Sequence, residues 1–177
     1  MKLHLIPSAY INSTYDIDFQ MLYDNGFRGL IFDIDNTLTQ HGAPAKSNAI
    51  KLFQELDEIG FKYILISNNH EERVAPFAEQ VGAEYVADAG KPLAKGYVAA
   101  IEKMDIDREY AIFIGDQMFT DIAGANAASI KSILVRPLSK KEPFHIKLKR
   151  MMEAPIKKMY LKNHKMGDYS NLLKLHL

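Results

Sequence analysis

Short apolar runs along this 177-residue chain are continuous instead of alternating with polar residues. They occupy 29–32, 63–66, 84–87, 111–114 and 132–135. Continuous runs of this length are typical of parallel strands whose two faces are both covered by helices. The chain is therefore predicted to form an α/β fold around a parallel sheet.

Amphipathic patterns between these runs predict helices. The predicted helices cover 47–59, 74–81, 93–104 and 120–128. Gly60 and Gly82 are expected to end the first two, since glycine readily takes the left-handed conformation after a helix. Pro76 suggests that the second helix begins late enough for the proline to lie in its first turn. Alternating strands and helices predict right-handed crossovers and a Rossmann-like, doubly wound sheet.

Polar residues follow four of the predicted strands. Asp33, Ser67 and Asp116 come at or just after a strand end, and Lys91 lies in the loop after another. Ligands of such sheets bind beyond the carboxyl ends of the strands, so these side chains are expected to meet at one edge. The full set of candidate site residues is Asp33, Asp35, Thr37, Ser67, Asn68, Lys91, Asp116 and Asp121.

These residue types suit phosphate chemistry beside a divalent cation. Mg²⁺ prefers carboxylate oxygens and offsets the charge that protects a phosphate monoester from attack. Asp33 is the candidate nucleophile, forming an aspartyl-phosphate. Asp35 is the candidate acid and base, first protonating the leaving oxygen and then activating water. Asp116 is expected to complete the cation site.

The remaining candidates have supporting roles. Ser67 and the Asn68 amide can donate to phosphoryl oxygens, while Lys91 supplies fixed positive charge. Thr37 can hold the first turn, and Asp121 can orient a metal-bound water. Any one of these residues alone is more often a turn former or a helix cap. Their fixed order, each after an apolar strand, favours the phosphate site.

The segment 33–38, Asp-Ile-Asp-Asn-Thr-Leu, resembles the first motif, DxDxT, of the haloacid dehalogenase-like (HAD) phosphatases. Ser67, Lys91, and Gly115-Asp116 with Asp121 resemble the second, third and fourth motifs, and the likeness spans about 28–137. The resemblance implies an HAD-like fold.

The same resemblance assigns roles to the matching residues. It implies that Asp33 is the nucleophile and Asp35 the acid and base. It also implies that Asp33, the main-chain carbonyl of Asp35, and Asp116 bind magnesium. Ser67 and Lys91 would bind the phosphate.

A closer resemblance, carried by 5–7, 15–18 and 67–69, is to the YqeG-type subclass IIIA members. That group is similar to phosphatidylglycerophosphate phosphatases, which makes this lipid phosphate the leading substrate. The stretches 38–67 and 67–91 each have room for one helix and one strand only. A separate cap domain is therefore not expected. We expect one capless domain over 1–177 with an open site.

The segment 140–165 is strongly basic, with nine lysines and arginines against two glutamates, a net charge of +7. Apolar residues keep helical spacing on either side of Pro155. One interpretation is a surface attracted to anionic membrane lipids. The other is a pair of helices that packs on the domain. In both interpretations, the basic residues are expected to lie apart from the catalytic site, because none of them is a candidate site residue.

Composition excludes some classes of protein. The chain has no cysteine, which excludes disulfides and cysteine-based zinc sites. No apolar stretch approaches the ~18–20 residues of a membrane span, and no signal peptide is evident. We therefore expect a cytoplasmic protein. If it binds a membrane, it is expected to do so peripherally.

Two classes of function stay open. The first is a magnesium-dependent phosphatase, acting on phosphatidylglycerophosphate or on a soluble phosphomonoester or phosphoprotein. The second is a non-catalytic module of the same fold that binds RNA, the ribosome or a membrane. Asp33 and Asp35 together favour the enzyme, since a binding module needs neither. Nucleic acid is not the expected partner, and the oligomeric state stays open.

Overall fold

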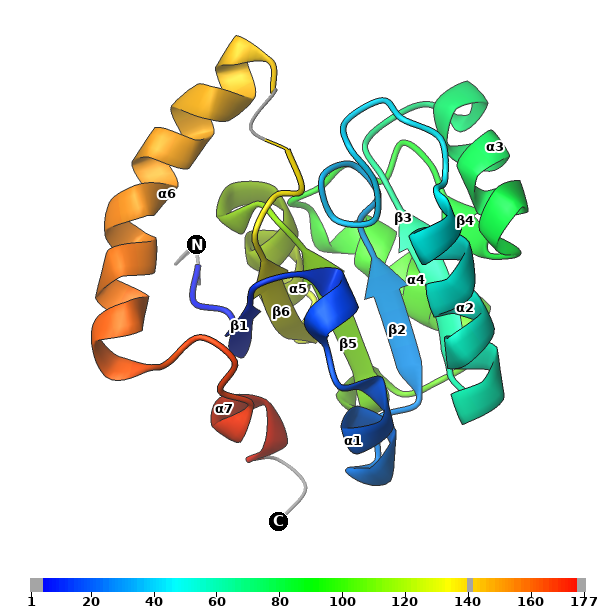
Figure 1. Ribbon diagram of the computed structural model, residues 1–177, viewed down its shortest axis with the longest axis horizontal. Coiled ribbons are helices and arrows are strands. Elements are labelled where there is room, and N and C mark those ends of the chain that lie inside the picture. The colour runs from blue at the N-terminus through cyan, green and yellow to red at the C-terminus, as the bar shows by residue number, and fades with distance from the viewer. Residues whose placement is uncertain (1–4, 140–141, 175–177) are drawn as a thin grey trace.

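The computed structural model describes residues 5–139 and 142–174, so Lys140 and Lys141 of the basic segment lie outside the described residues. The described residues form a six-stranded, wholly parallel sheet in the order β1-β6-β5-β2-β3-β4 (Figure 1). The strands are β1 Ala9–Ile11, β2 Gly29–Phe32, β3 Lys62–Ile66, β4 Glu84–Val86, β5 Ala111–Gly115 and β6 Lys131–Val135. The predicted α/β class and parallel sheet are confirmed.

Among the described residues, five α-helices lie between successive strands, and two more follow β6. They are α1 Phe19–Asp24, α2 Ser47–Ile59, α3 Glu71–Val81, α4 Ala94–Met104, α5 Ala123–Ala127, α6 Phe144–Asn163 and α7 Ser170–Leu173. Gly60 and Gly82 cap α2 and α3 in the left-handed conformation, as predicted. The helix predicted at 120–128 is a π-helical turn, η3 Met118–Ile122, that leads into α5.

The prediction for Pro76 was wrong. Helix α3 begins at Glu71, so the proline lies in the helix interior. Proline removes the hydrogen bond to the carbonyl four residues back, here that of Glu72 in the first turn. Glu72 is exposed, so water can donate a hydrogen bond to its carbonyl in place of the missing amide.

Both faces of the sheet are covered. In β2, Leu30 and Phe32 contribute to the core under α1, α2 and α3, while Ile31 lies in the core under α4 and α5. Tyr10 of β1 and Leu134 of β6 face α6 and η3. A strand buried on both sides needs apolar residues at every position, which explains the continuous runs in the sequence.

The connections that could hold a cap domain hold none. Residues between 38 and 67 form α2 and β3, and those between 67 and 91 form α3 and β4. The prediction of a capless fold therefore agrees with the described part of the chain.

Helix α6 is a single helix of 20 residues that stands beyond the β1 side of the sheet (Figure 1). The expected pair of helices was wrong, because Pro155 lies inside it. This proline deprives only the carbonyl of Met151 of a helical partner, and Met151 is exposed. Ile146, Glu153 and Tyr160, seven residues apart, form the buried stripe of α6.

Candidate active site

The candidate residues gather at the carboxyl edge of the sheet. Asp33 follows β2, Ser67 follows β3, Lys91 lies in the loop after β4, and Asp116 follows β5. These four strands are neighbours in the sheet. The Asp33 amide donates to the carbonyl of Ile114 on β5 at 2.9 Å. The hydrogen bonding between β2 and β5 therefore continues to the first residue of the catalytic loop and holds its main chain in place.

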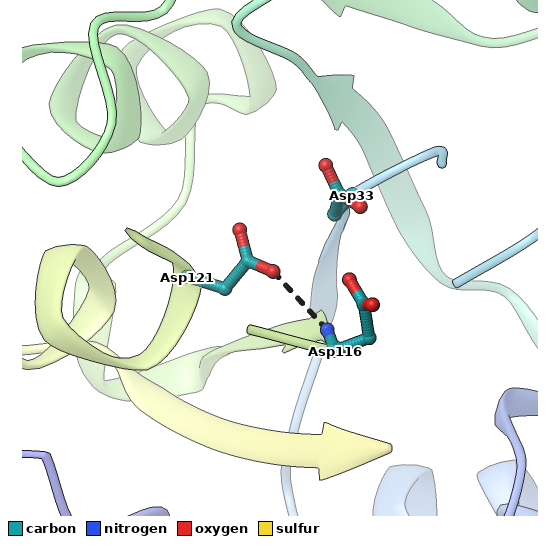
Figure 2. A group of neighbouring side chains, drawn as sticks. All are labelled: Asp33, Asp116 and Asp121. Carbon is teal, nitrogen blue, oxygen red and sulfur yellow. Dashed lines mark hydrogen bonds between the residues drawn. The ribbon is translucent and has the colours of Figure 1, made fainter. Parts of the chain in front are cut away.

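Three buried carboxylates form the centre of the site. One oxygen from each of Asp33, Asp116 and Asp121 lies within 4.8 Å of the others (Figure 2). An all-oxygen set of this size and charge fits a hard divalent cation such as Mg²⁺. The sequence assigned Asp121 a supporting role, whereas the structure places it in the cluster itself.

Lys91 neutralises part of this charge. Its Nζ donates to Asp33 Oδ1 at 2.6 Å and to Asp121 Oδ1 at 2.8 Å. Burial alone would lower the pKa of Lys91, but Asp121 and Asp33 raise it well above its ordinary value, so the ammonium stays charged. Burial raises the pKa of Asp33 to about 7, against the opposing effect of Lys91. Lys91 therefore pairs with two of the three carboxylates of the cluster.

Asp121 is held by main-chain groups. Its Oδ2 accepts from the amide of Asp116 at 3.1 Å (Figure 2) and from the amide of Gln117 at 3.0 Å. Gly115 makes this approach possible, because a Cβ atom there would lie 2.6 Å from Asp121 Oδ2. The turn after β5 is therefore built around the Asp121 side chain.

Thr37 joins two of the carboxylates. Its hydroxyl lies 3.2 Å from Asp33 Oδ2 and 3.4 Å from Asp116 Oδ1. These two oxygens therefore face the same region, on the side of Asp33 away from Lys91. We infer that a cation held by Asp33 and Asp116 would lie there.

Asp35 is directed away from the three-carboxylate cluster. Its carboxylate accepts from Asn69 Nδ2 at 2.7 Å, Arg73 Nη2 at 3.0 Å and the Gly42 amide at 2.8 Å. It nevertheless lines the same cavity as Asp33. To protonate a leaving group, the Asp35 side chain would have to leave at least part of this network.

The second and third loops are bonded together. The Asn68 side chain accepts from the Lys91 amide at 2.7 Å and donates to the Lys91 carbonyl at 3.0 Å. This side chain thus positions Lys91, a role that the sequence did not suggest. Ser67 is buried, and its Oγ accepts from the Asn69 amide at 3.1 Å, which leaves its proton available to a ligand.

Helix α6 brings an unforeseen arginine to the cluster. The Arg150 guanidinium bonds to both Oδ2 and the main-chain oxygen of Asp116. It also donates to Glu142 Oε1 at 2.7 Å and lies 3.5 Å from Glu153. The expectation that the basic segment lies apart from the site was therefore wrong.

Arg150 and the acidic side chains around it form a network of ion pairs. Burial opposes its charge, but Asp116 and Glu142 raise the pKa of the guanidinium. Glu153 is fully buried, accepts from the Met118 amide at 2.7 Å and pairs with Lys157 at 2.8 Å. One sequence signal pointed to this network: Glu142 and Glu153 are the two acidic residues of a strongly basic segment.

The site opens into a cavity of about 200 Å³. Its lining combines the catalytic loops with the first turns of α6: Asp33, Asp35, His41, Ser67, Asn68, Asn69, Lys91, Gln117, Thr120, His145, Ile146 and Lys149. His70, the other histidine near the second motif, pairs with Asp88 at 2.7 Å on the exposed surface. The cavity is small enough to enclose a phosphate group and the atoms next to it.

The sequence is similar to known hydrolases and phosphatases. Residues 41–129 match the family model of the haloacid dehalogenase-like hydrolases. The Bacillus subtilis protein named "Probable phosphatase YqeG" is 32% identical over 157 residues, which cover 88% of this chain and 91% of that protein.

More distant relatives are longer. Phosphatidylglycerophosphate phosphatase 1 of Arabidopsis thaliana is 27% identical over 172 residues, and this chain spans about half of that protein, 49%. The Chlamydomonas reinhardtii phosphatase of the same name is also 27% identical and is matched over 55% of its length.

Solved structures share the fold. A crystal structure of an uncharacterised Listeria monocytogenes protein matches with a TM-score of 0.52 at 18% identity, covering 78% of this chain and all of that one. At this level of identity the match supports the fold alone.

Proposed function

The chain belongs to the haloacid dehalogenase-like hydrolases and is a phosphatase, and we propose that it hydrolyses phosphomonoesters with Mg²⁺ through an aspartyl-phosphate on Asp33. The observation that carries the proposal is the buried cluster of Asp33, Asp116 and Asp121 beside Lys91. The named phosphatases among its relatives favour an enzyme over a non-catalytic binding module.

The proposed first step is attack of an Asp33 carboxylate oxygen on phosphorus. The bond to the ester oxygen breaks as the new P–O bond forms, and Asp35 gives its proton to the departing alcohol. Lys91 and the Ser67 hydroxyl stabilise the charge on the phosphoryl oxygens. Bound Mg²⁺ would supply Lewis-acid stabilisation of the same oxygens.

The second step releases phosphate. Asp35, now ionised, takes a proton from water, and the water oxygen attacks the aspartyl-phosphate. Free phosphate leaves and the Asp33 carboxylate is restored. Asn69 and Arg73, which hold Asp35 before the reaction, can stabilise its ionised form between the steps.

Phosphatidylglycerophosphate is the leading substrate in this proposal. Two relatives named for that activity support it. A capless site accessible from the carboxyl edge of the sheet also suits a substrate that stays anchored in a bilayer. A soluble phosphomonoester is the alternative.

The outer face of α6 supports peripheral contact with a membrane. Its exposed apolar residues recur at the spacing of one helical stripe: Phe144, Leu148, Met151, Met152 and Met159. Lys147, Lys158 and Lys162 are exposed and lie close to this stripe by helical spacing. We propose that this lipid-facing stripe rests on an anionic bilayer. Among the described residues, no helix is long and apolar enough to cross one.

A substrate panel tests the proposed activity. Purified protein is assayed for phosphate release from soluble phosphomonoesters and from phosphatidylglycerophosphate in mixed micelles, with Mg²⁺ or with EDTA. We expect turnover with Mg²⁺ only, and higher kcat/KM on the lipid. Equal turnover in EDTA would rule out the magnesium step, and preference for a soluble ester would rule out the lipid as leading substrate.

A further inference from the structure

Helix α6 forms one wall of the active-site cavity. His145, Ile146 and Lys149 line it together with residues of the catalytic loops. Ile146 is buried and fixes this part of the helix, while His145 and Lys149 are four residues apart and so share one face. Two side chains able to carry positive charge therefore border the same cavity as Asp33.

The other cations at the site are already engaged. Lys91 pairs with Asp33 and Asp121, Arg73 with Asp35, and Arg150 with Asp116 and Glu142. Within 5–139 and 142–174, neither Lys149 nor His145 makes an ion pair or a side-chain hydrogen bond. Lys149 thus faces the cavity with its charge available to a ligand.

The cavity therefore has an inner and an outer region. Lys91 and Asp33 are buried at its inner end, where the scissile phosphate would bind. Lys149 is only half-buried and comes from a different element, so it lies nearer the solvent. A ligand atom beside Lys149 is consequently some bonds away from the reacting phosphorus.

We propose that Lys149, with His145, binds a second phosphate group of the substrate, so that the enzyme prefers phosphomonoesters carrying another phosphate nearby. The inference rests on the proposed phosphatase function and deepens it. A lysine ammonium is a compact point charge well suited to phosphate oxygens. Two kinds of molecule share this chemistry: the headgroup of a phosphorylated phospholipid and a soluble bisphosphate.

The test compares substrates with and without a second phosphate. Glycerol 1,3-bisphosphate and glycerol 3-phosphate form the soluble pair, and short-chain phosphatidylglycerophosphate and phosphatidate, both below their micelle concentrations, form the lipid pair. We expect kcat/KM to be at least about tenfold higher for the first member of a pair, equivalent to ~1.4 kcal/mol. A preference in the lipid pair alone would show that the second phosphate recognised by the enzyme belongs to a lipid headgroup.

Matched variants assign the effect to Lys149. Lys149→Gln should reduce the preference to about threefold or less, mainly through KM of the bisphosphate. Lys51→Gln removes the same charge from an exposed position on α2, outside the cavity, and should keep the preference.

The outcomes distinguish a failure of the second-phosphate site from a failure of the proposed phosphatase function. Equal kcat/KM within both pairs would overturn the second-phosphate site while leaving the phosphatase intact. An equal loss on both members in Lys149→Gln would also overturn it, because Lys149 would then serve the scissile phosphate. Absence of hydrolysis of every substrate would instead contradict the proposed function.

Discussion

The guanidinium of Arg150 bonds to the carboxylate and to the main-chain carbonyl of Asp116, linking α6 to the end of β5. Because Arg150 takes Oδ2, the other oxygen of Asp116 is left toward Thr37 and Asp33. The contact therefore fixes the direction in which Asp116 presents an oxygen to a cation. Arg150 is in this sense a positioning residue.

Arg150→Gln should destabilise the protein by about 3 kcal/mol, because removing one partner leaves buried Asp116, Glu142 and Glu153 without their common cation. Urea unfolding in EDTA measures the change, with Lys147→Gln as the control for a lost charge on α6. An unchanged midpoint would mean that the Arg150 network contributes nothing to stability.

Asp33→Asn should lower kcat by more than about 1,000-fold, since the amide cannot form the phosphoenzyme. Phosphate release from a generic phosphomonoester with Mg²⁺ measures it, and circular dichroism checks that the variant folds. Retained turnover would contradict the nucleophile assignment.

The stability of the metal-free protein should depend on Asp33. Its pKa is raised from 3.8 to about 7 in the folded state, so the native protein holds a proton that the unfolded chain has lost between these pH values. Stability from this group is therefore present at low pH and is lost as pH rises from about 4 to about 7.

Denaturant unfolding in EDTA across this range measures the effect. Asp33→Asn should show a shallower decline and exceed the wild type in stability at pH 7. Mg²⁺ should stabilise the wild type more than the variant, because the variant lacks one carboxylate ligand. The same slope in both proteins would mean that Asp33 is ionised throughout.

Asp116→Ala should lower activity and raise the Mg²⁺ concentration needed for half-maximal rate by about tenfold or more, because a hard cation loses a carboxylate ligand. Calorimetric titration with Mg²⁺ gives the binding change independently of turnover. An unchanged Mg²⁺ dependence would reduce Asp116 to a turn residue.

Much of the fold was predictable because strand burial leaves a direct signature in sequence. Continuous apolar runs located β2, β3, β5 and β6 to within a residue or so. The three-residue strand β1 was missed, whereas β4, of the same length, was located between a predicted helix and the loop that holds Lys91. The meeting of the catalytic groups at one edge of the sheet followed from their positions at strand ends.

The direction of individual side chains was not predictable. Asp35 follows Asp33 by two residues, yet its carboxylate is bound by Arg73 and Asn69, more than 30 residues away. Arg150 meets Asp116 across 34 residues, through a helix whose path depends on tertiary packing. Local patterns carry no information on such contacts.

The lipid-facing stripe of α6 predicts binding to anionic vesicles. Phe144 is 81% exposed and Met151 72%, and burying such side chains in the bilayer interface is favourable. Each flanking lysine near an anionic surface contributes ~1 kcal/mol. Binding should therefore rise with anionic lipid content and fall with salt, because screening shortens the range of attraction to ~8–10 Å.

Two variants separate the contributions of charge and apolar surface. Reversing Lys147, Lys158 and Lys162 to glutamate should remove most of the binding at low salt, and Phe144→Ser with Met151→Ser should weaken it at every salt concentration. None of these residues lines the active-site cavity or forms an ion pair with a catalytic group in the described structure, so turnover of a soluble phosphomonoester should persist. Co-sedimentation at two salt concentrations measures binding, and failure of the unmodified protein to pellet at low salt would end the membrane proposal.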